Sequence, residues 1–168
     1  MSHILNIIII DQQEEKTYKT IKPLVVRAEA KGILLDPYLK NINGISYLVM
    51  LEEENGYQCS CQFAYYSDDE NQELILHFSK NQLEELKELF NELFNDSPKK
   101  CLIVYLETNR IITYPDEVFP ADVRIEYLEG LKDFWEKHDK NKIVENTLYF
   151  VCGDLNYRKT LEQSLKLN

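Results

Sequence analysis

The feature that most restricts the fold of this chain is a run of four consecutive isoleucines, Ile7 to Ile10. β-Branched side chains favour strands, and a run that is apolar at every position is typical of a strand buried on both faces. We therefore predict a central strand over residues 3–10. Such a strand requires other elements to pack against both faces of its sheet, which predicts a layered domain of helices and strands.

Three further strand-like segments follow in the middle of the chain. Residues 45–51 and 74–78 are mainly apolar. Over residues 57–66, aromatic or cysteine side chains alternate with side chains that are mostly polar, so one face of that segment is more polar than the other. Asn55-Gly56 separates the first two segments and is a hairpin signal, while a polar turn over residues 67–71 separates the last two. This pattern predicts a three-stranded antiparallel β-meander.

Two amphipathic helices are predicted in the second half of the chain. The clearer one covers residues 82–95, where leucine and phenylalanine recur at helical spacing after a capping box made by Ser79 and Gln82. Its charged residues, mainly glutamate, are interpreted as a solvated face. The other helix is capped by Asp122, and its predicted buried face consists of Tyr127, Leu128, Leu131, Phe134 and Trp135.

The remaining segments give weaker patterns. Helices are predicted from Pro23 to a stop at Gly32, from Asp36-Pro37 onward, and over residues 156–167. Strands are predicted over residues 101–107 and 147–152, with a short one over 110–114. Together these elements predict a single α/β domain over residues 1–168, of the α+β kind, with a mixed, largely antiparallel sheet and packed helices.

Charge restricts the partners of the protein. The chain has 29 acidic and 19 basic residues, a formal net charge of -10, which disfavours direct binding to nucleic acid or to an anionic membrane and attracts a basic protein. No apolar run approaches the roughly 20 residues of a membrane-spanning helix, and residues 1–10 lack the pattern of a secretory signal. We expect a cytoplasmic protein.

The sequence contains no recognisable catalytic, cofactor-binding or metal-binding motif. Its three histidines lie far apart, its five glycines are scattered, and neither a G-x-S-x-G elbow nor a phosphate-binding loop is present. The four cysteines are interpreted as buried core residues, although Cys59 and Cys61 would share one face of a strand and could place two thiolates on a metal. We therefore predict no catalytic residue, cofactor or metal.

One part of the chain resembles the acetyltransferase superfamily that includes histone acetyltransferases. The resemblance rests on the predicted helix over 82–95 and the strand over 103–107 followed by Asn109, roughly a quarter of the chain. In that superfamily a glycine-rich loop before the helix binds acyl-CoA, whereas residues 78–82 contain no glycine. The resemblance implies a divergent acyltransferase using Tyr105, Glu107 or His77 for proton transfer, or a scaffold without the chemistry.

In general character, as a small acidic domain without catalytic motifs, the chain resembles the immunity proteins of bacterial nuclease toxins, including those of contact-dependent inhibition systems. This resemblance implies a non-catalytic inhibitor that occludes a basic toxin with acidic loops or by adding a strand at a sheet edge. A purely structural adaptor would have the same sequence features. Three acidic clusters are the predicted partner-binding residues, with solvated turns as the alternative: Glu52, Glu53, Glu54; Asp68, Asp69, Glu70, Glu73; and Asp116, Glu117, Asp122.

Overall fold

The structure of the protein is a computed structural model. It describes residues 4–19, 24–33, 42–52, 58–59, 64–66, 74–77, 80–107, 124–137, 142–144 and 147–166. The elements in chain order are β1 (Ile4–Ile10), β2 (Leu24–Ile33), β3 (Asn43–Glu52), β4 (Gln58–Cys59), β5 (Ala64–Tyr66), β6 (Leu74–His77), α1 (Lys80–Asp96), β7 (Cys101–Glu107), β8 (Arg124–Leu128), α2 (Leu131–Lys137), β9 (Lys142–Val144), β10 (Thr147–Cys152) and α3 (Leu155–Lys166).

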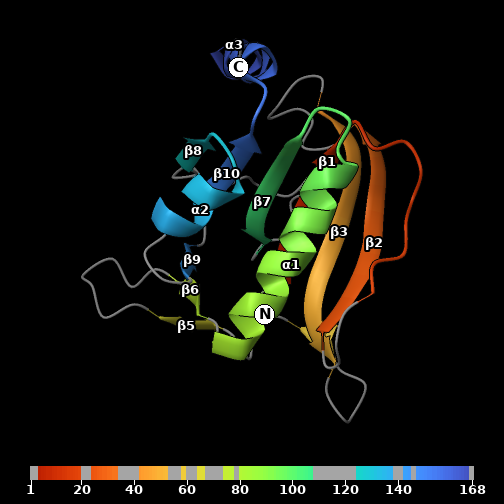
Figure 1. Cartoon of the computed structure of the whole chain (residues 1–168), viewed down its shortest axis with the longest axis vertical. Helices are drawn as coiled ribbons and strands as arrows, with labels where there is room; N and C mark the ends of the chain where they lie inside the picture. Colours follow the sequence, from red (N-terminus) through yellow and green to blue (C-terminus); the bar gives the residue numbers. More distant parts are fainter. Residues whose placement is uncertain are drawn as a thin grey trace.

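The main sheet has the strand order β2-β3-β1-β7-β10-β8, and β4 pairs with the end of β3 (Figure 1). Every pair in it is antiparallel except β10 with β8, which is parallel. A smaller antiparallel sheet has the order β5-β6-β9. The predicted fold class, α+β with a mixed and mostly antiparallel sheet, is confirmed.

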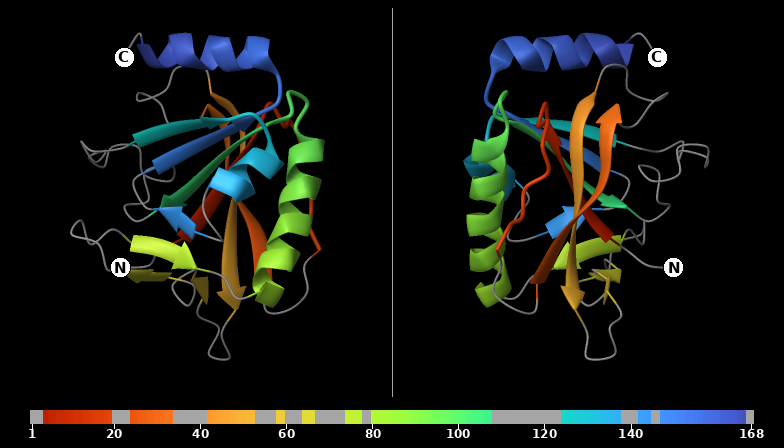
Figure 2. Two further views of the ribbon diagram at one scale, coloured as in Figure 1. Left: turned by 60° about the vertical axis from the view of Figure 1, so that its left-hand side comes forward. Right: turned by 90° about the vertical axis from the view of Figure 1, so that its right-hand side faces the viewer.

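The isoleucine run forms the central strand, as predicted. β1 lies between β3 and β7, and all four isoleucines from Ile7 to Ile10 are fully buried. Ile7 and Ile9 belong to the core cluster that also contains residues of α1 and α2, while Ile8 and Ile10 belong to a second cluster against which Tyr157 of α3 packs. Figure 2 shows α1 and α2 on one face of the main sheet and α3 across its end.

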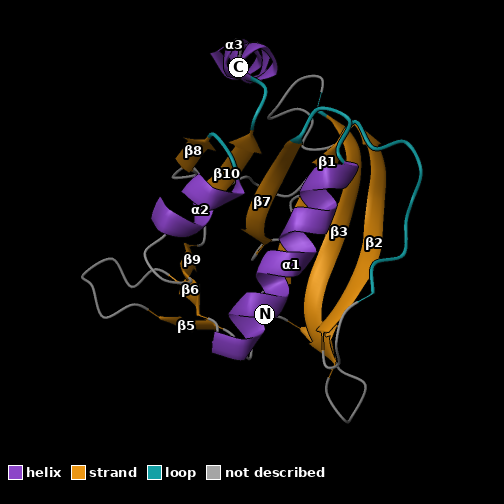
Figure 3. Cartoon of the chain, in the orientation of Figure 1, coloured by secondary structure: helices purple, strands orange, loops and turns teal. Residues whose placement is uncertain are grey.

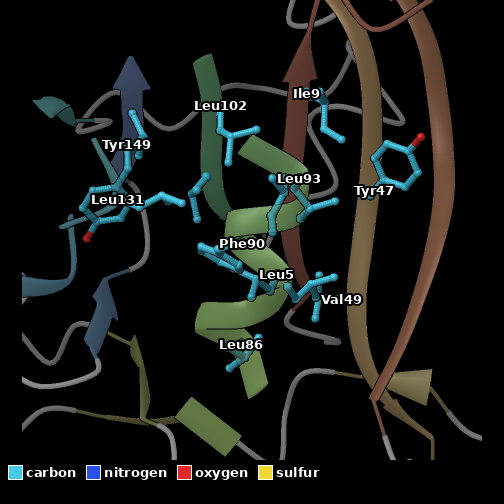
Figure 4. Packing of buried hydrophobic residues seen from close by; sticks show 14 of the residues in the cluster. Leu5, Ile9, Tyr47, Val49, Leu86, Phe90, Leu93, Leu102, Leu131 and Tyr149 are labelled. Atoms are coloured by element: carbon cyan, nitrogen blue, oxygen red, sulfur yellow. The ribbon is translucent and has the colours of Figure 1, made fainter. Parts of the chain in front are cut away.

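The helix α1 is the best predicted element. Its apolar residues Leu86, Phe90 and Leu93 are buried against the sheet (Figure 4). The ring of Phe90 lies 5.9 Å from that of Phe134 and 5.1 Å from that of Trp135, centroid to centroid, which joins α1 to α2. None of the described helices is long and apolar enough to cross a membrane.

The helix predicted from Pro23 to Gly32 is wrong, because residues 24–33 form the strand β2. β2 pairs antiparallel with β3 from Leu24 to Ile33, with a β-bulge between Ala28 and Ala30. The apolar residues at the start of this segment suit a strand as well as a helix, and pairing with the long neighbouring strand decides between them. Gly32, predicted as a helix stop, instead has a φ of 111° within the strand.

The predicted single meander is divided between two sheets. The middle segment forms two short strands, β4 and β5, of which β4 pairs with β3 in the main sheet and β5 pairs with β6 in the small one. Hairpin signals predict which strands follow each other but not where a strand changes partner. The strand β9, which pairs with β6, was not predicted.

The helix predicted after Asp122 is correct only in its second half. Residues 124–128 form the strand β8, and α2 begins at Leu131, after Gly130. Tyr127 and Leu128 belong to core clusters on opposite faces of the sheet, an alternation that is typical of a strand. The strands over 101–107 and 147–152 and the terminal helix are confirmed as β7, β10 and α3. Ser79, Asp36-Pro37, residues 110–114 and Asp122 lie outside the described residues.

Candidate functional site

The three acidic clusters predicted from the sequence fall almost entirely outside the described residues. Glu52 is the last residue of β3. The described ranges include none of the other nine: Glu53, Glu54, Asp68, Asp69, Glu70, Glu73, Asp116, Glu117 and Asp122. The structure therefore locates one end of the first cluster, at the end of β3, and the partner-binding role of all ten residues stays a prediction.

A row of glutamates along α1 is an acidic surface that the structure does describe. Glu84, Glu88 and Glu92 are all exposed. Residues spaced by four lie one above another on a helix, so the three carboxylates form a stripe along its axis. Figure 3 places α1 on the near side of the molecule, in front of the main sheet.

The buried side of α1 fixes the direction of this stripe. Phe90 and Leu93 are fully buried, so the opposite side of the helix faces solvent. Lys87 Nζ lies 5.8 Å from the centroid of the Trp135 ring in α2, within the range of a cation–π contact. The stripe therefore lies on a helix whose orientation is determined by its packing in the core.

The stripe does not stabilise the helix that carries it. Like charges at a spacing of four destabilise an isolated helix by about 0.2–0.5 kcal/mol per pair. Among the described side chains, none forms an ion pair with Glu84, Glu88 or Glu92. These glutamates are predicted from the sequence only as a solvated face, and their spacing of four residues is the signal that identifies an acidic stripe.

A hydrogen-bond network lies at the C-terminal end of the stripe, where Asp96 ends α1. The Tyr18 hydroxyl donates to Asp96 Oδ2 at 2.8 Å, and Lys16 Nζ contacts the same oxygen at 2.9 Å. Gln12 Nε2 donates to the Tyr18 oxygen at 3.0 Å, while Gln12 Oε1 accepts from the Tyr47 hydroxyl at 2.6 Å. The network fastens residues 11–19 beside α1, on the same face of the sheet (Figure 2).

The network determines the ionisation of its members. Partial burial raises the pKa of Asp96, but hydrogen bonds from Lys16 and Tyr18 outweigh this effect and lower the pKa below its ordinary value. Burial raises the pKa of the Tyr18 phenol, and its hydrogen bond to Asp96 raises it further. Asp96 is therefore a carboxylate at neutral pH, and Tyr18 is its neutral donor.

Asp96→Asn is expected to lower the free energy of unfolding at pH 7 by about 1 kcal/mol, since the amide loses the charged acceptor but keeps an oxygen for Tyr18. A carboxyl group whose pKa is lower in the folded state stabilises the protein above its unfolded pKa, and this contribution is lost as pH falls through the folded pKa. The difference between the two proteins should therefore begin to shrink below about pH 4, the pKa of an unfolded aspartate, and disappear only below the lowered pKa of Asp96, as measured by urea unfolding at several pH values.

Lys16→Met is the matched control for this prediction. It removes the exposed partner of the ion pair but leaves the hydrogen bond from Tyr18 to Asp96. Its effect at pH 7 should be smaller than that of Asp96→Asn, because exposed ion pairs contribute little. An Asp96→Asn effect that is the same at pH 3 and pH 7 would contradict the assignment of a stabilising carboxylate.

The residues implied by the acetyltransferase resemblance are not gathered around one described site. Tyr105 is fully buried in β7, between β1 and β10. Glu107 is the last residue of β7, whereas His77 ends β6 in the other sheet. α1 thus connects strands of two different sheets. No group of three or more histidine, cysteine or acidic side chains that could hold a metal occurs among the described residues.

Comparisons with protein-family models, with curated proteins and with solved structures found no match to this chain.

Proposed function

We propose that this protein is a non-catalytic, cytoplasmic binding protein that neutralises a basic protein partner, as an immunity protein blocks a nuclease toxin. The observation that carries the proposal is the stripe of Glu84, Glu88 and Glu92 on α1. Its charge suits a cationic surface, its direction is fixed by the core, and it is not explained by helix stability. The net charge of -10 adds long-range attraction of the same sign.

The proposed inhibition works by occlusion. A nuclease holds phosphate with basic side chains, and an acidic helix placed over them competes for the same positions. Electrostatic attraction between oppositely charged surfaces also raises the association rate, especially at low salt.

Strand addition at β2 is the less favoured way of binding. β2 lies at the edge of the main sheet, and its ten residues offer a long template. However, it contains a β-bulge between Ala28 and Ala30 and exposed charges at Arg27 and Lys31. Bulges and edge charges are features that hinder pairing with another chain. The proposal therefore assigns partner binding to α1.

The test begins with affinity capture from the host cell and identification of the bound protein. With a basic partner purified, the triple variant Glu84→Lys, Glu88→Lys, Glu92→Lys should associate at least roughly tenfold more slowly at low salt, because charge complementarity acts mainly on the association rate. The difference should shrink as salt is added, since exposed charges are screened. Stopped-flow or surface-plasmon-resonance kinetics would measure both effects.

The control is the triple variant Glu126→Lys, Glu129→Lys, Glu136→Lys, which changes the net charge equally at exposed positions outside α1. Equal loss in both variants would show that net charge, not the stripe, steers the partner. Unchanged association of the α1 variant would contradict the assigned surface. Capture of no basic protein, together with a melting temperature raised by acetyl-CoA, would favour the acyltransferase instead.

A further inference from the structure

Two cysteines face each other across neighbouring strands of the main sheet. Cys101, the first residue of β7, pairs in register with Cys152, the last residue of β10. Both side chains are fully buried and belong to the second core cluster, with Tyr157 of α3 packed against it. Both are free thiols. The proposed binding surface on α1 uses neither of them.

The hydrogen bonds around this pair show which kind of antiparallel site it occupies. The Gly153 amide donates to the Lys100 carbonyl at 3.0 Å, so the bond lies just outside the cysteines. The Cys101 amide donates to Ser97 Oγ at 3.1 Å and not to β10. Cys101 and Cys152 therefore form a non-hydrogen-bonded pair, in which the two Cα atoms are typically about 4.5 Å apart. That separation falls within the range for disulfides, about 4.4–6.8 Å.

The two thiols differ in acidity. A hydrogen bond from the Cys101 thiol lowers the pKa of Cys152, whereas burial raises the pKa of Cys101. The thiolate is the nucleophilic form of cysteine. Cys152 is thus the thiol of the pair that ionises first, and while protonated it donates a hydrogen bond to the backbone oxygen of Asp154 at 3.5 Å.

We propose that Cys101 and Cys152 form a reversible disulfide with hydrogen peroxide as oxidant. The Cys152 thiolate attacks one peroxide oxygen, the O–O bond breaks, and a sulfenic acid and hydroxide form; the hydroxide takes up the proton that Cys152 lost on ionising and becomes the first water. The Cys101 sulfur then attacks the Cys152 sulfur, the S–O bond breaks, and the Cys101 proton and the departing hydroxide leave as water. In total two thiols are oxidised and one peroxide is reduced to two waters; a dithiol reverses the bond by exchange.

Both thiols are fully buried, so a small oxidant reaches them only when this end of the sheet opens. Cys101 and Cys152 lie one residue inside the end of the sheet, beside the exposed residues Lys100 and Gly153. Ends of elements open more readily than their centres. Tyr157 of α3, which packs against the cluster that contains both cysteines, is only partly buried. The disulfide would then join β7 to β10 at the point where the chain leaves the sheet for α3.

The experiment uses the full chain carrying Cys59→Ser and Cys61→Ser, so that only Cys101 and Cys152 remain. After treatment with hydrogen peroxide and unfolding in the presence of an alkylating reagent, the intact mass should show no alkylated cysteine and the loss of two hydrogens. Dithiothreitol should restore two alkylated cysteines. The melting temperature of the oxidised protein should rise by roughly 5–10 °C, because the disulfide closes a long loop in the unfolded chain.

The same background carrying Cys101→Ser is the control, in which peroxide should leave the melting temperature without this rise. If the double serine background does not fold, peptide mapping of the oxidised wild-type chain replaces it and should link the Cys101 and Cys152 peptides. The proposal is overturned if both thiols remain alkylatable after peroxide treatment, if they are oxidised singly without becoming linked, or if either pairs with Cys59 or Cys61.

Discussion

Phe90→Ala is expected to lower the free energy of unfolding by about 3–5 kcal/mol. Phe90 is fully buried at the centre of the interface between α1 and the main sheet, and its ring contacts those of Phe134 and Trp135. Truncation removes these aromatic contacts and leaves a cavity. The surrounding helices and sheet cannot move far enough to fill it. This loss is large for a single substitution because the Phe90 side chain packs against both α2 and the main sheet.

Urea unfolding followed by far-ultraviolet circular dichroism measures this loss. Trp135 is the only tryptophan of the chain, so its fluorescence reports the same packing directly. Leu155→Ala is the control: Leu155 is 60% exposed at the start of α3, and its truncation should change the stability by less than about 0.5 kcal/mol. A loss below 1 kcal/mol for Phe90→Ala would mean that α1 is not packed on the sheet as described.

The elements predicted correctly are those whose sequence pattern matches their burial. Ile7 to Ile10 are apolar at every position because both faces of β1 are covered. The apolar residues of α1, including Leu86, Phe90 and Leu93, recur at helical spacing because one side of the helix faces the sheet and the other faces solvent. In both elements the local pattern and the tertiary environment require the same structure, so the sequence alone was sufficient.

The wrong predictions concern segments that could satisfy two patterns. Residues 24–33 contain apolar residues that fit a short helix, and only the pairing of β2 with β3 makes them a strand. Tyr127 and Leu128 fit the apolar side of a helix that continues to Phe134, yet they lie on opposite faces of the sheet because β8 pairs with β10. In both segments the strand is determined by its pairing with another strand and not by the pattern of its own residues.

The acidic character of the candidate site could be predicted from the sequence, but most of its spatial arrangement could not. Acidity was evident from composition, and the spacing of Glu84, Glu88 and Glu92 could be read from the sequence once the helix was predicted. The network around Asp96 could not, because the contact of Lys16 with Asp96 joins residues 80 positions apart. The pairing of Cys101 with Cys152 likewise depends on the register of β7 and β10.

Gly44→Ala is expected to lower the free energy of unfolding by about 3 kcal/mol or more, because overpacking against a rigid backbone is not relieved by rotation of a side chain. Gly44 in β3 lies opposite Ile10 of β1 and opposite Gly32 of β2. A Cβ atom on it would clash with the backbone oxygen of Ile9 and lie 3.1 Å from the Ile9 carbonyl carbon and 3.2 Å from the Ile10 Cα. All three atoms belong to the central strand, which β3 and β7 hold on both sides.

Gly130→Ala makes the same chemical change where the structure has room. No atom lies within 4 Å of a Cβ built on Gly130, just before α2. This variant should be neutral or slightly stabilising, since alanine restricts the unfolded chain more than glycine does. Thermal unfolding of both variants separates the steric effect from the loss of backbone freedom that they share. If Gly44→Ala were as stable as Gly130→Ala, the close approach of β3 to β1, and with it the centre of the sheet, would be wrong.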